Sequence, residues 1–195
     1  MGCMNEYYTE RLSAERLQRC YDIAPQRIKQ YLEAELNFVL NRINPGDLVL
    51  ELGCGYGRII PALAKKARWV VGIDKSISSL LYGQRLLCNT SNSLLIQMDA
   101  AQLSFLDGTF DVLFSSYSDK FWEYRLEWFL RQSEAGLLGK IDFDKTRDGV
   151  IVCKDGFTAT TVGPDRFLKL TSGLSVNTTI VEVDESALFC VMVVR

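Results

Sequence analysis

Three glycines at alternate positions directly follow a short run of strand-forming residues. The run is Leu48–Leu52, and the glycines are Gly53, Gly55 and Gly57. Because glycine has no Cβ, backbone N–H groups at the end of a strand can approach a ligand closely there, and the N-terminus of a following helix adds to them. The pattern therefore favours a binding loop at the carboxyl end of this strand. A tight turn without a ligand is the simpler alternative.

The spacing of the glycines separates two classes of nucleotide cofactor. A dinucleotide fingerprint, G-x-G-x-x-G, would place its last glycine at position 58, where this chain has Arg58. The chain has G-x-G-x-G instead. The spacing therefore argues against NAD.

Alternating strand and helix patterns must position this loop. Residues 1–43 have a helical pattern with one apolar face, and the turn sequence at Asn44–Asp47 ends it. Strand patterns then cover residues 48–52, 69–73, 94–98 and 111–116, and helix patterns cover 58–66, 76–87, 119–130 and 164–171. Strands that alternate with helices predict an α/β fold, a parallel sheet with helices on both faces. The last third predicts a hairpin at Lys154–Phe157 and a final antiparallel strand pair at the sheet edge.

Composition predicts one globular domain of a cytoplasmic protein. The chain has 195 residues, 48% of them hydrophobic, and a net charge of −2 without a basic run or a membrane-length apolar run, so neither nucleic acid nor a membrane is an expected partner. Six cysteines without a CxxC pair favour reduced thiols. Histidine is absent, which excludes His-dependent catalysis and most zinc sites, and no metal is expected.

Three segments occur in an order that is typical of one enzyme family. They are "VLELGCGYGR" from Val49, "WVVGIDKS" from Trp69 and "LLIQMDAAQL" from Leu94. Over residues 28–112 the chain resembles the class I S-adenosylmethionine-dependent methyltransferases. The resemblance implies a doubly wound, mostly parallel Rossmann-like sheet with an antiparallel C-terminal strand pair. It also implies the cofactor S-adenosyl-L-methionine and the product S-adenosyl-L-homocysteine.

The resemblance assigns roles to individual residues. Asp74 would accept bonds from the ribose hydroxyls, Asp99 and Ala100 would hold the adenine, and Glu51 would help to place the ammonium group. For each Asp, the alternative role is that of a helix cap. Arg58 could face the methionine carboxylate of the cofactor, but a solvated position in the first helical turn is favoured. Tyr8 and Arg11 belong to a segment that covers the pocket in many relatives, although core or surface aromatics are an equal alternative for the tyrosines. The full set of cofactor-binding candidates is Glu51, Gly53, Gly55, Gly57, Asp74, Lys75, Asp99, Ala100, Tyr8 and Arg11.

The acceptor side of the reaction is less specified, and no catalytic residue is assigned. Without histidine, a general base must be Asp, Glu, Tyr or Lys, or the acceptor must arrive as a nucleophile. The Pro-Pro-aromatic motif of nucleic-acid amino-methylating enzymes is absent, so a small-molecule acceptor is expected. Two groups of residues could contact this acceptor. The first is Ser115, Ser116, Tyr117 and Asp119, for which ending the strand and capping the next helix is the favoured interpretation. The second is the aromatic set Phe121, Trp122, Tyr124, Trp128 and Phe129, for which packing of a helix on a sheet is favoured.

The pattern departs from the family at Val112 and Leu113. A single strand pattern there stands in place of the fourth and fifth strands of the family. A β-α-β unit of about 30 residues is therefore missing. Either the sheet is one strand and one crossover helix short, with an apolar edge that favours a homodimer, or a segment is absent from the printed sequence. The missing part would include the loop that touches the methyl group and the acceptor in the family. A non-catalytic S-adenosylmethionine-binding sensor or interaction protein is therefore the alternative function.

The chain is predicted to be a single methyltransferase domain with three parts. Residues 1–43 would form an N-terminal helical lid, residues 44–112 the cofactor-binding half, and residues 113–195 the substrate-side half.

Overall fold

The computed structural model describes most of the chain, in two compact units. The described residues are 7–114, 122–147, 149–160, 165, 168–169, 172–173, 176–183 and 187–194. The first unit comprises residues 1–23 and 36–116, and the second comprises 24–35 and 117–195. The candidates Ser115, Ser116, Tyr117, Asp119 and Phe121 lie outside the described residues, as does most of the predicted helix at 164–171.

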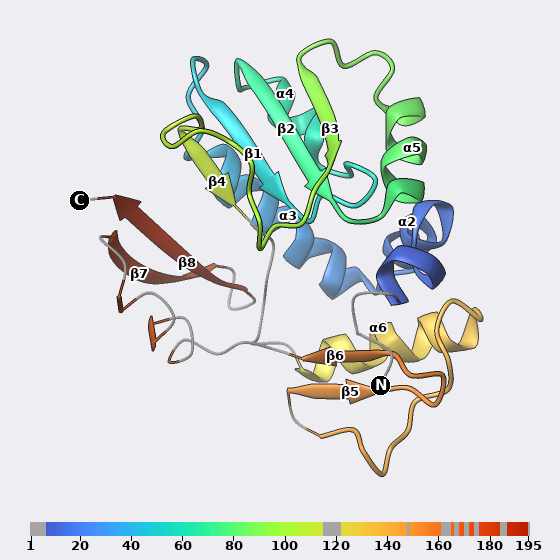
Figure 1. Ribbon diagram of the computed structural model, residues 1–195. Coiled ribbons are helices and arrows are strands. Elements are labelled where there is room, and N and C mark those ends of the chain that lie inside the picture. Colours follow the sequence, from blue (N-terminus) through green and yellow to red (C-terminus); the bar gives the residue numbers. More distant parts are fainter. Residues whose placement is uncertain are drawn as a thin grey trace. The chain divides into compact units, whose positions relative to one another are not determined.

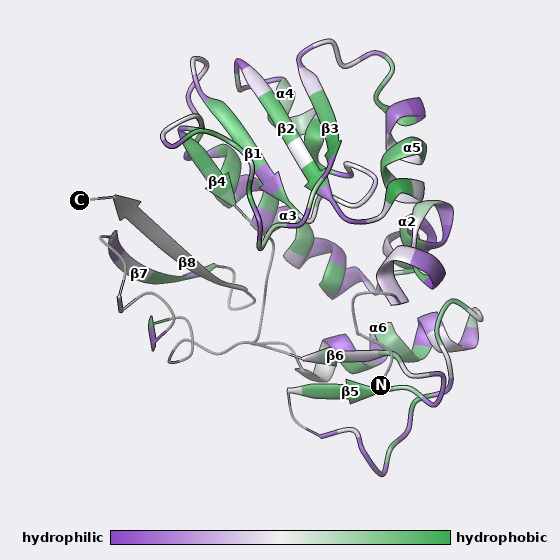
Figure 2. Ribbon diagram, viewed as in Figure 1, coloured by the Kyte–Doolittle hydropathy of each residue, from purple (hydrophilic) through white to green (hydrophobic). Residues whose placement is uncertain are grey.

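A four-stranded parallel sheet forms the centre of the first unit (Figure 1). Its strands are β1 (Leu48–Leu52), β2 (Trp69–Asp74), β3 (Ser93–Gln97) and β4 (Val112–Phe114), in the order β3-β2-β1-β4. Mainly hydrophobic residues run along β1 and β4 (Figure 2), and Val49 and Val70 are fully buried in the middle of the sheet. The predicted parallel sheet is confirmed. All four strands point their carboxyl ends to one edge.

The helices of the chain's first 86 residues follow the predicted pattern, with one shortening. A π-helical turn, η1 (Tyr7–Arg11), precedes α2 (Ala14–Asp22) and α3 (Gln26–Leu40), and α5 (Ile77–Leu86) follows β2. The helix expected over residues 58–66 is only α4 (Ile60–Ala64). It starts late because the glycine turn continues through Ile60, whose N–H donates to Gly57 O at 3.2 Å, and Pro61 then occupies the first helical turn.

The strand β4 runs without a break through the position where the family pattern fails. Val112 pairs with Val49, Leu113 with Leu50, and Phe114 with Glu51, in continuous register. Val112 and Leu113 therefore belong to one strand, as the shorter sheet requires. In the described residues β4 is also an edge strand, so pairing with a second chain stays a prediction.

The second unit contains one helix and two antiparallel strand pairs. They are α6 (Trp122–Glu134), the pair β5 (Val150–Val152) and β6 (Thr158–Thr160), and the pair β7 (Val176–Val183) and β8 (Ala187–Val194). The predicted hairpin is confirmed, and the N–H of Cys153 donates to Phe157 O at 2.8 Å across its turn. The predicted final strand pair also forms, but β7 and β8 bond only to each other in the described residues and do not extend the parallel sheet. Within the described part of the chain, no helix is long and apolar enough to cross a membrane.

Candidate functional site

The loop after β1 contains three residues in the left-handed region of backbone space. Gly53, Gly55 and Gly57 have φ values of 70°, 56° and 75°. A residue with a side chain rarely adopts these angles, which explains the choice of glycine at all three positions. The loop is also fixed by backbone bonds, because Cys54 N donates to Ile73 O at 2.9 Å and Gly57 N donates to Cys54 O at 2.8 Å.

The three glycines have different surroundings. A Cβ at Gly55 would lie 2.9 Å from Cδ2 of Leu17, and a Cβ at Gly57 would lie 3.0 Å from Cδ1 of Leu87. A Cβ at Gly53 would meet no atom within 4 Å. Other side chains therefore lie close to the loop at Gly55 and Gly57, whereas a Cβ at Gly53 would point into open space.

Asp74 joins the glycine loop to the start of α5. Its Oδ2 accepts a bond from the N–H of Gly55 at 2.9 Å, and its Oδ1 accepts one from the N–H of Ser76 at 2.7 Å. The cap of α5 is Ser76, whose hydroxyl oxygen accepts from the N–H of Ser79. Asp74 is therefore not simply the helix cap: its carboxylate bridges two segments at the carboxyl edge of the sheet.

Glu51 lies beneath this loop as a buried carboxyl group. Its side chain is 7% exposed, and its Oε2 has no hydrogen-bond partner among the described residues. Burial raises the pKa of Glu51 to about 8, an effect that the nearby Arg58 reduces and Asp74 reinforces. With this pKa, the carboxyl group is mostly neutral at pH 7. Its unpartnered oxygen is suited to a positively charged group.

We expect Glu51→Gln to flatten the pH dependence of stability between about pH 4.5 and pH 8. The folded chain keeps a proton on Glu51 up to about pH 8, whereas the unfolded chain releases it near the usual pKa of 4.5. Stability that is present below pH 4.5 is thus lost as the pH rises to about 8, at about 1.4 kcal/mol per pH unit. Urea unfolding between pH 5 and pH 8 measures this slope.

The matched control for this measurement is Glu33→Gln, which changes an exposed carboxylate of α3. Its pH profile should follow that of the unsubstituted protein. An unchanged slope in Glu51→Gln would contradict the buried, neutral carboxyl group.

Lys75 and Asp99 form an ion pair at the ends of neighbouring strands. Nζ of Lys75 lies 2.8 Å from Oδ2 of Asp99, and the N–H of Ala101 donates to Oδ1 of Asp99 at 3.0 Å. The hydrogen bond from Lys75 has the largest effect on the pKa of Asp99 and the bond from the N–H of Ala101 the next largest. Both hold this pKa below its usual range. Ala100 is exposed beside this pair.

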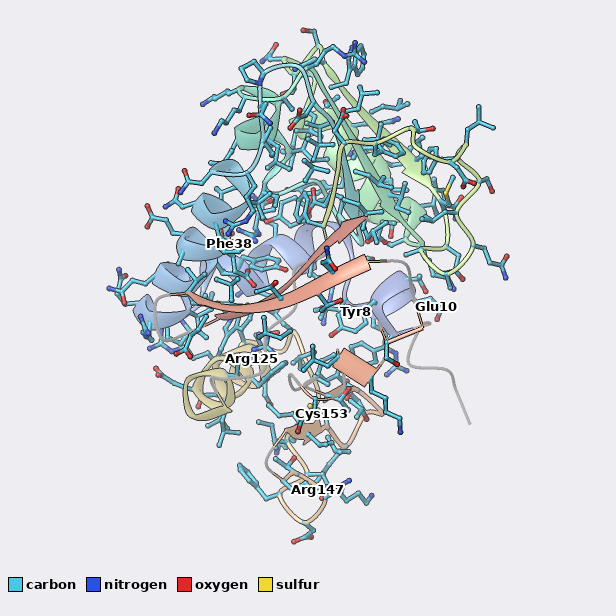
Figure 3. All side chains as sticks on the ribbon, turned by 90° about the vertical axis from the view of Figure 1, so that its left-hand side faces the viewer. Tyr8, Glu10, Phe38, Arg125, Arg147 and Cys153 are labelled. Atoms are coloured by element: carbon cyan, nitrogen blue, oxygen red, sulfur yellow. The ribbon has the colours of Figure 1, made fainter. Side chains whose placement is uncertain are left out.

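The N-terminal segment approaches α5 at the same end of the sheet. The N–H of Ala14 donates to Oγ of Ser79 at 3.0 Å, and the hydroxyl of Ser76 lies 3.5 Å from Thr9 O. Figure 3 shows Tyr8 and Glu10 on the η1 turn. Tyr8 is 44% exposed, and Arg11, also exposed, places its Cζ 5.7 Å from the centroid of the Tyr7 ring.

Several contacts of the loop were not expected from the sequence. Arg58 is half-buried rather than solvated, with its Cζ 4.7 Å from the centroid of the Tyr21 ring. The ring of Tyr56 lies edge-on between Tyr21 and Tyr82, at centroid distances of 6.3 and 6.1 Å. Leu17 and Tyr21 are four residues apart on α2 and so share a face of the helix. This spacing is the feature of the sequence from which their common contact with the loop could have been predicted.

Two aromatic residues of α6 pack within the second unit. Trp128 contacts the cluster of Ala24, Ile28 and Tyr31, and the ring of Phe129 lies 5.7 Å from that of Phe157. Both side chains therefore pack against other residues of the second unit, and the expected packing of this helix on the parallel sheet stays a prediction. The side chains of Trp122 and Tyr124 lie outside the described residues.

Sequence comparison finds a similarity over the part of the chain that contains the glycine loop, Asp74 and Asp99. A family model described as "Methyltransferase domain" matches residues 49–137. The chain is similar to a demethylmenaquinone methyltransferase of Mycobacterium marinum, with 36% identity over 77 residues, which are 39% of this chain and 31% of that protein. The chain spans less than a third of the length of the curated relatives it matches.

Two solved structures share the fold over most of the chain. The PH0226 protein of Pyrococcus horikoshii OT3 has a TM-score of 0.62 and 20% identity, over 97% of this chain and 99% of that one. The complex of DhpI with SAH has a TM-score of 0.61 and 18% identity, over 95% and 92% of the two chains. At these identities the likeness establishes the fold, which agrees with the one expected from the sequence.

Proposed function

We propose that the chain is a class I S-adenosylmethionine-dependent methyltransferase and that it methylates a small-molecule acceptor with S-adenosyl-L-methionine. The observation that carries the proposal is the bond from the N–H of Gly55 to the Asp74 carboxylate. It joins the glycine loop to the acidic residue at the end of the next strand. The spacing of the glycines distinguishes this cofactor from a dinucleotide, whereas an acidic residue at the end of the second strand occurs in both kinds of site.

The residues present fit this cofactor in two respects. The open space at Gly53 leaves room for a ligand against the backbone. The unpartnered Oε2 of Glu51, next to that loop, is suited to the ammonium group of a methionine moiety. A cation beside this carboxyl group favours its ionised form, so the energetic cost of burying the charge is offset by the ligand.

The other side chains would bind and orient the cofactor. Each Asp74 oxygen accepts one backbone bond and keeps a second acceptor site, which is available to a ribose hydroxyl. Asp99 and Ala100 would hold the adenine, and the segment with Tyr8 and Arg11 would cover the site. The cofactor supplies a methyl group on a sulfonium, and such an in-line displacement depends mainly on alignment and exclusion of water.

The acceptor is proposed to be a small molecule that arrives as a nucleophile. An amine, a thiolate or a carboxylate needs no histidine, which this chain lacks. A solved relative bound to SAH supports the choice of cofactor. The choice of a small acceptor rests on the acidic composition and on the absence of the Pro-Pro-aromatic motif.

We expect S-adenosylmethionine and S-adenosylhomocysteine to bind with dissociation constants in the micromolar range and NAD to bind hardly at all. The side chain of Arg58 stands where a dinucleotide site needs its third glycine. Isothermal titration calorimetry with the three ligands is the direct test. Heat of binding with NAD, and none with either sulfur compound, would overturn the assignment of the cofactor.

A turnover assay tests the methyl transfer itself. The protein is incubated with S-adenosylmethionine and a panel of amines, thiols, carboxylic acids and alcohols, and S-adenosylhomocysteine is quantified. Formation that depends on both an acceptor and Asp74 supports the enzyme. Tight binding without turnover across a broad panel would instead favour the non-catalytic sensor.

A further inference from the structure

Lys75 and Asp99 are brought together by the pairing of β2 with β3. Asp74 is the register partner of Gln97 at the last position of the two strands. The pairing continues beyond the strand ends, since Met98 N donates to Asp74 O at 3.0 Å and Nε2 of Gln97 donates to Lys75 O at 3.2 Å. The two segments therefore leave the sheet side by side. This fixes the backbone of both ion-pair partners.

The ion pair has a clear geometry and little energetic value of its own. Nζ of Lys75 lies 2.8 Å from Oδ2 of Asp99, and the two side chains are 39% and 38% exposed. Pairs exposed to this degree contribute little to stability. The more important consequence is geometric. One oxygen is held by Lys75 and the other by the N–H of Ala101, so the carboxylate cannot rotate freely.

We propose that Lys75 is a positioning residue that fixes the Asp99 carboxylate for a purine with a 6-amino group and thereby helps the site to reject a 6-oxo purine. This inference rests on the proposed function, because it takes Asp99 as the residue that faces the base. An ionised carboxylate only accepts hydrogen bonds, so it pairs with an amino group and repels a carbonyl oxygen. A site with a fixed acceptor discriminates more strongly than one whose acceptor can turn away.

The test compares two ligands that differ at this one group, S-adenosylhomocysteine and its deaminated form, S-inosylhomocysteine. In Lys75→Met, which keeps the length of the side chain without its charge, the dissociation constant for the adenosine compound should rise about threefold to tenfold, equivalent to about 0.7–1.4 kcal/mol. Binding of the inosine compound should change by less than about twofold, because it gains nothing from a fixed Asp99. Lys75→Arg should restore most of the preference.

A double-mutant cycle separates positioning from direct contact with the ligand. If Lys75 acts through Asp99, Lys75→Met should have no further effect in the Asp99→Ala background. An equal effect in both backgrounds would overturn the proposal, because it would mean that Lys75 binds the ligand itself. Equal losses for both ligands in Lys75→Met would overturn it too. Absence of S-adenosylhomocysteine binding in the unsubstituted protein would instead refute the proposed function.

Discussion

Asp74→Ala is expected to lower the affinity for S-adenosylhomocysteine at least about tenfold. The variant would lose the two charge-assisted bonds to the ribose that we propose for Asp74, each worth about 1.5–3 kcal/mol. The structure adds a second cause. The N–H groups of Gly55 and Ser76 lose their shared acceptor, so the loop is no longer tied to the start of α5.

A matched control is available at the opposite edge of the sheet. The Asp111 carboxylate accepts a bond from the N–H of Leu48 at 2.8 Å, at the amino end of β1. Asp111→Ala should therefore cost stability in thermal unfolding and leave the dissociation constant within about twofold of the original. If Asp74→Ala binds as tightly as Asp111→Ala, Asp74 does not belong to the binding site.

Gly53→Ala is expected to weaken cofactor binding more than tenfold while the chain stays folded. The added methyl group points into the open space that the ligand is proposed to occupy. It also forces a side chain into the left-handed region at φ 70°, which costs about 1–2 kcal/mol of stability.

Gly108→Ala separates backbone strain from loss of binding. Gly108 has the same φ of 70°, and a Cβ there also meets no atom within 4 Å. It lies in the connection between β3 and β4, four residues before the amino end of β4. Both variants should lose a similar amount of thermal stability, and only Gly53→Ala should lose binding in calorimetry. If both variants lose binding, or if both keep it, the ligand does not lie against Gly53.

Local sequence patterns predicted the strands well because each strand is a buried apolar run with clear ends. The first was expected at residues 48–52 and is found there, and β2 and β3 differ from their expected bounds by one residue at each shifted end. The predictions were less accurate where the chain turns. The strand expected at 111–116 begins one residue later, at Val112, and its expected end lies outside the described residues. The helix α4 lacks the first two residues expected for it because the glycine turn continues through them.

The candidate site was predictable in its residue types but not in its contacts. The order of the glycines, Asp74 and Asp99 is visible in the sequence, as are the sheet positions that bring them to one edge. The contact of Leu17 with Gly55 and that of Arg58 with Tyr21 depend on how α2 packs against the loop. The division of the chain into lid, cofactor-binding half and substrate-side half likewise stays a prediction.

If Glu51 receives the ammonium group of the cofactor as proposed, the proton competes with the cofactor for this buried carboxyl group. Its Oε2 has no partner among the described residues, and the group holds its proton up to about pH 8. A cationic ligand in the proposed position displaces that proton, so each binding event at neutral pH acidifies the solution by up to one proton per protein molecule. By linkage, acidification below about pH 8 would weaken this binding, whereas pH values well above 8 would remove the charge of the ligand's own ammonium group. A protein without a single histidine would thus sense pH near neutrality through one glutamate.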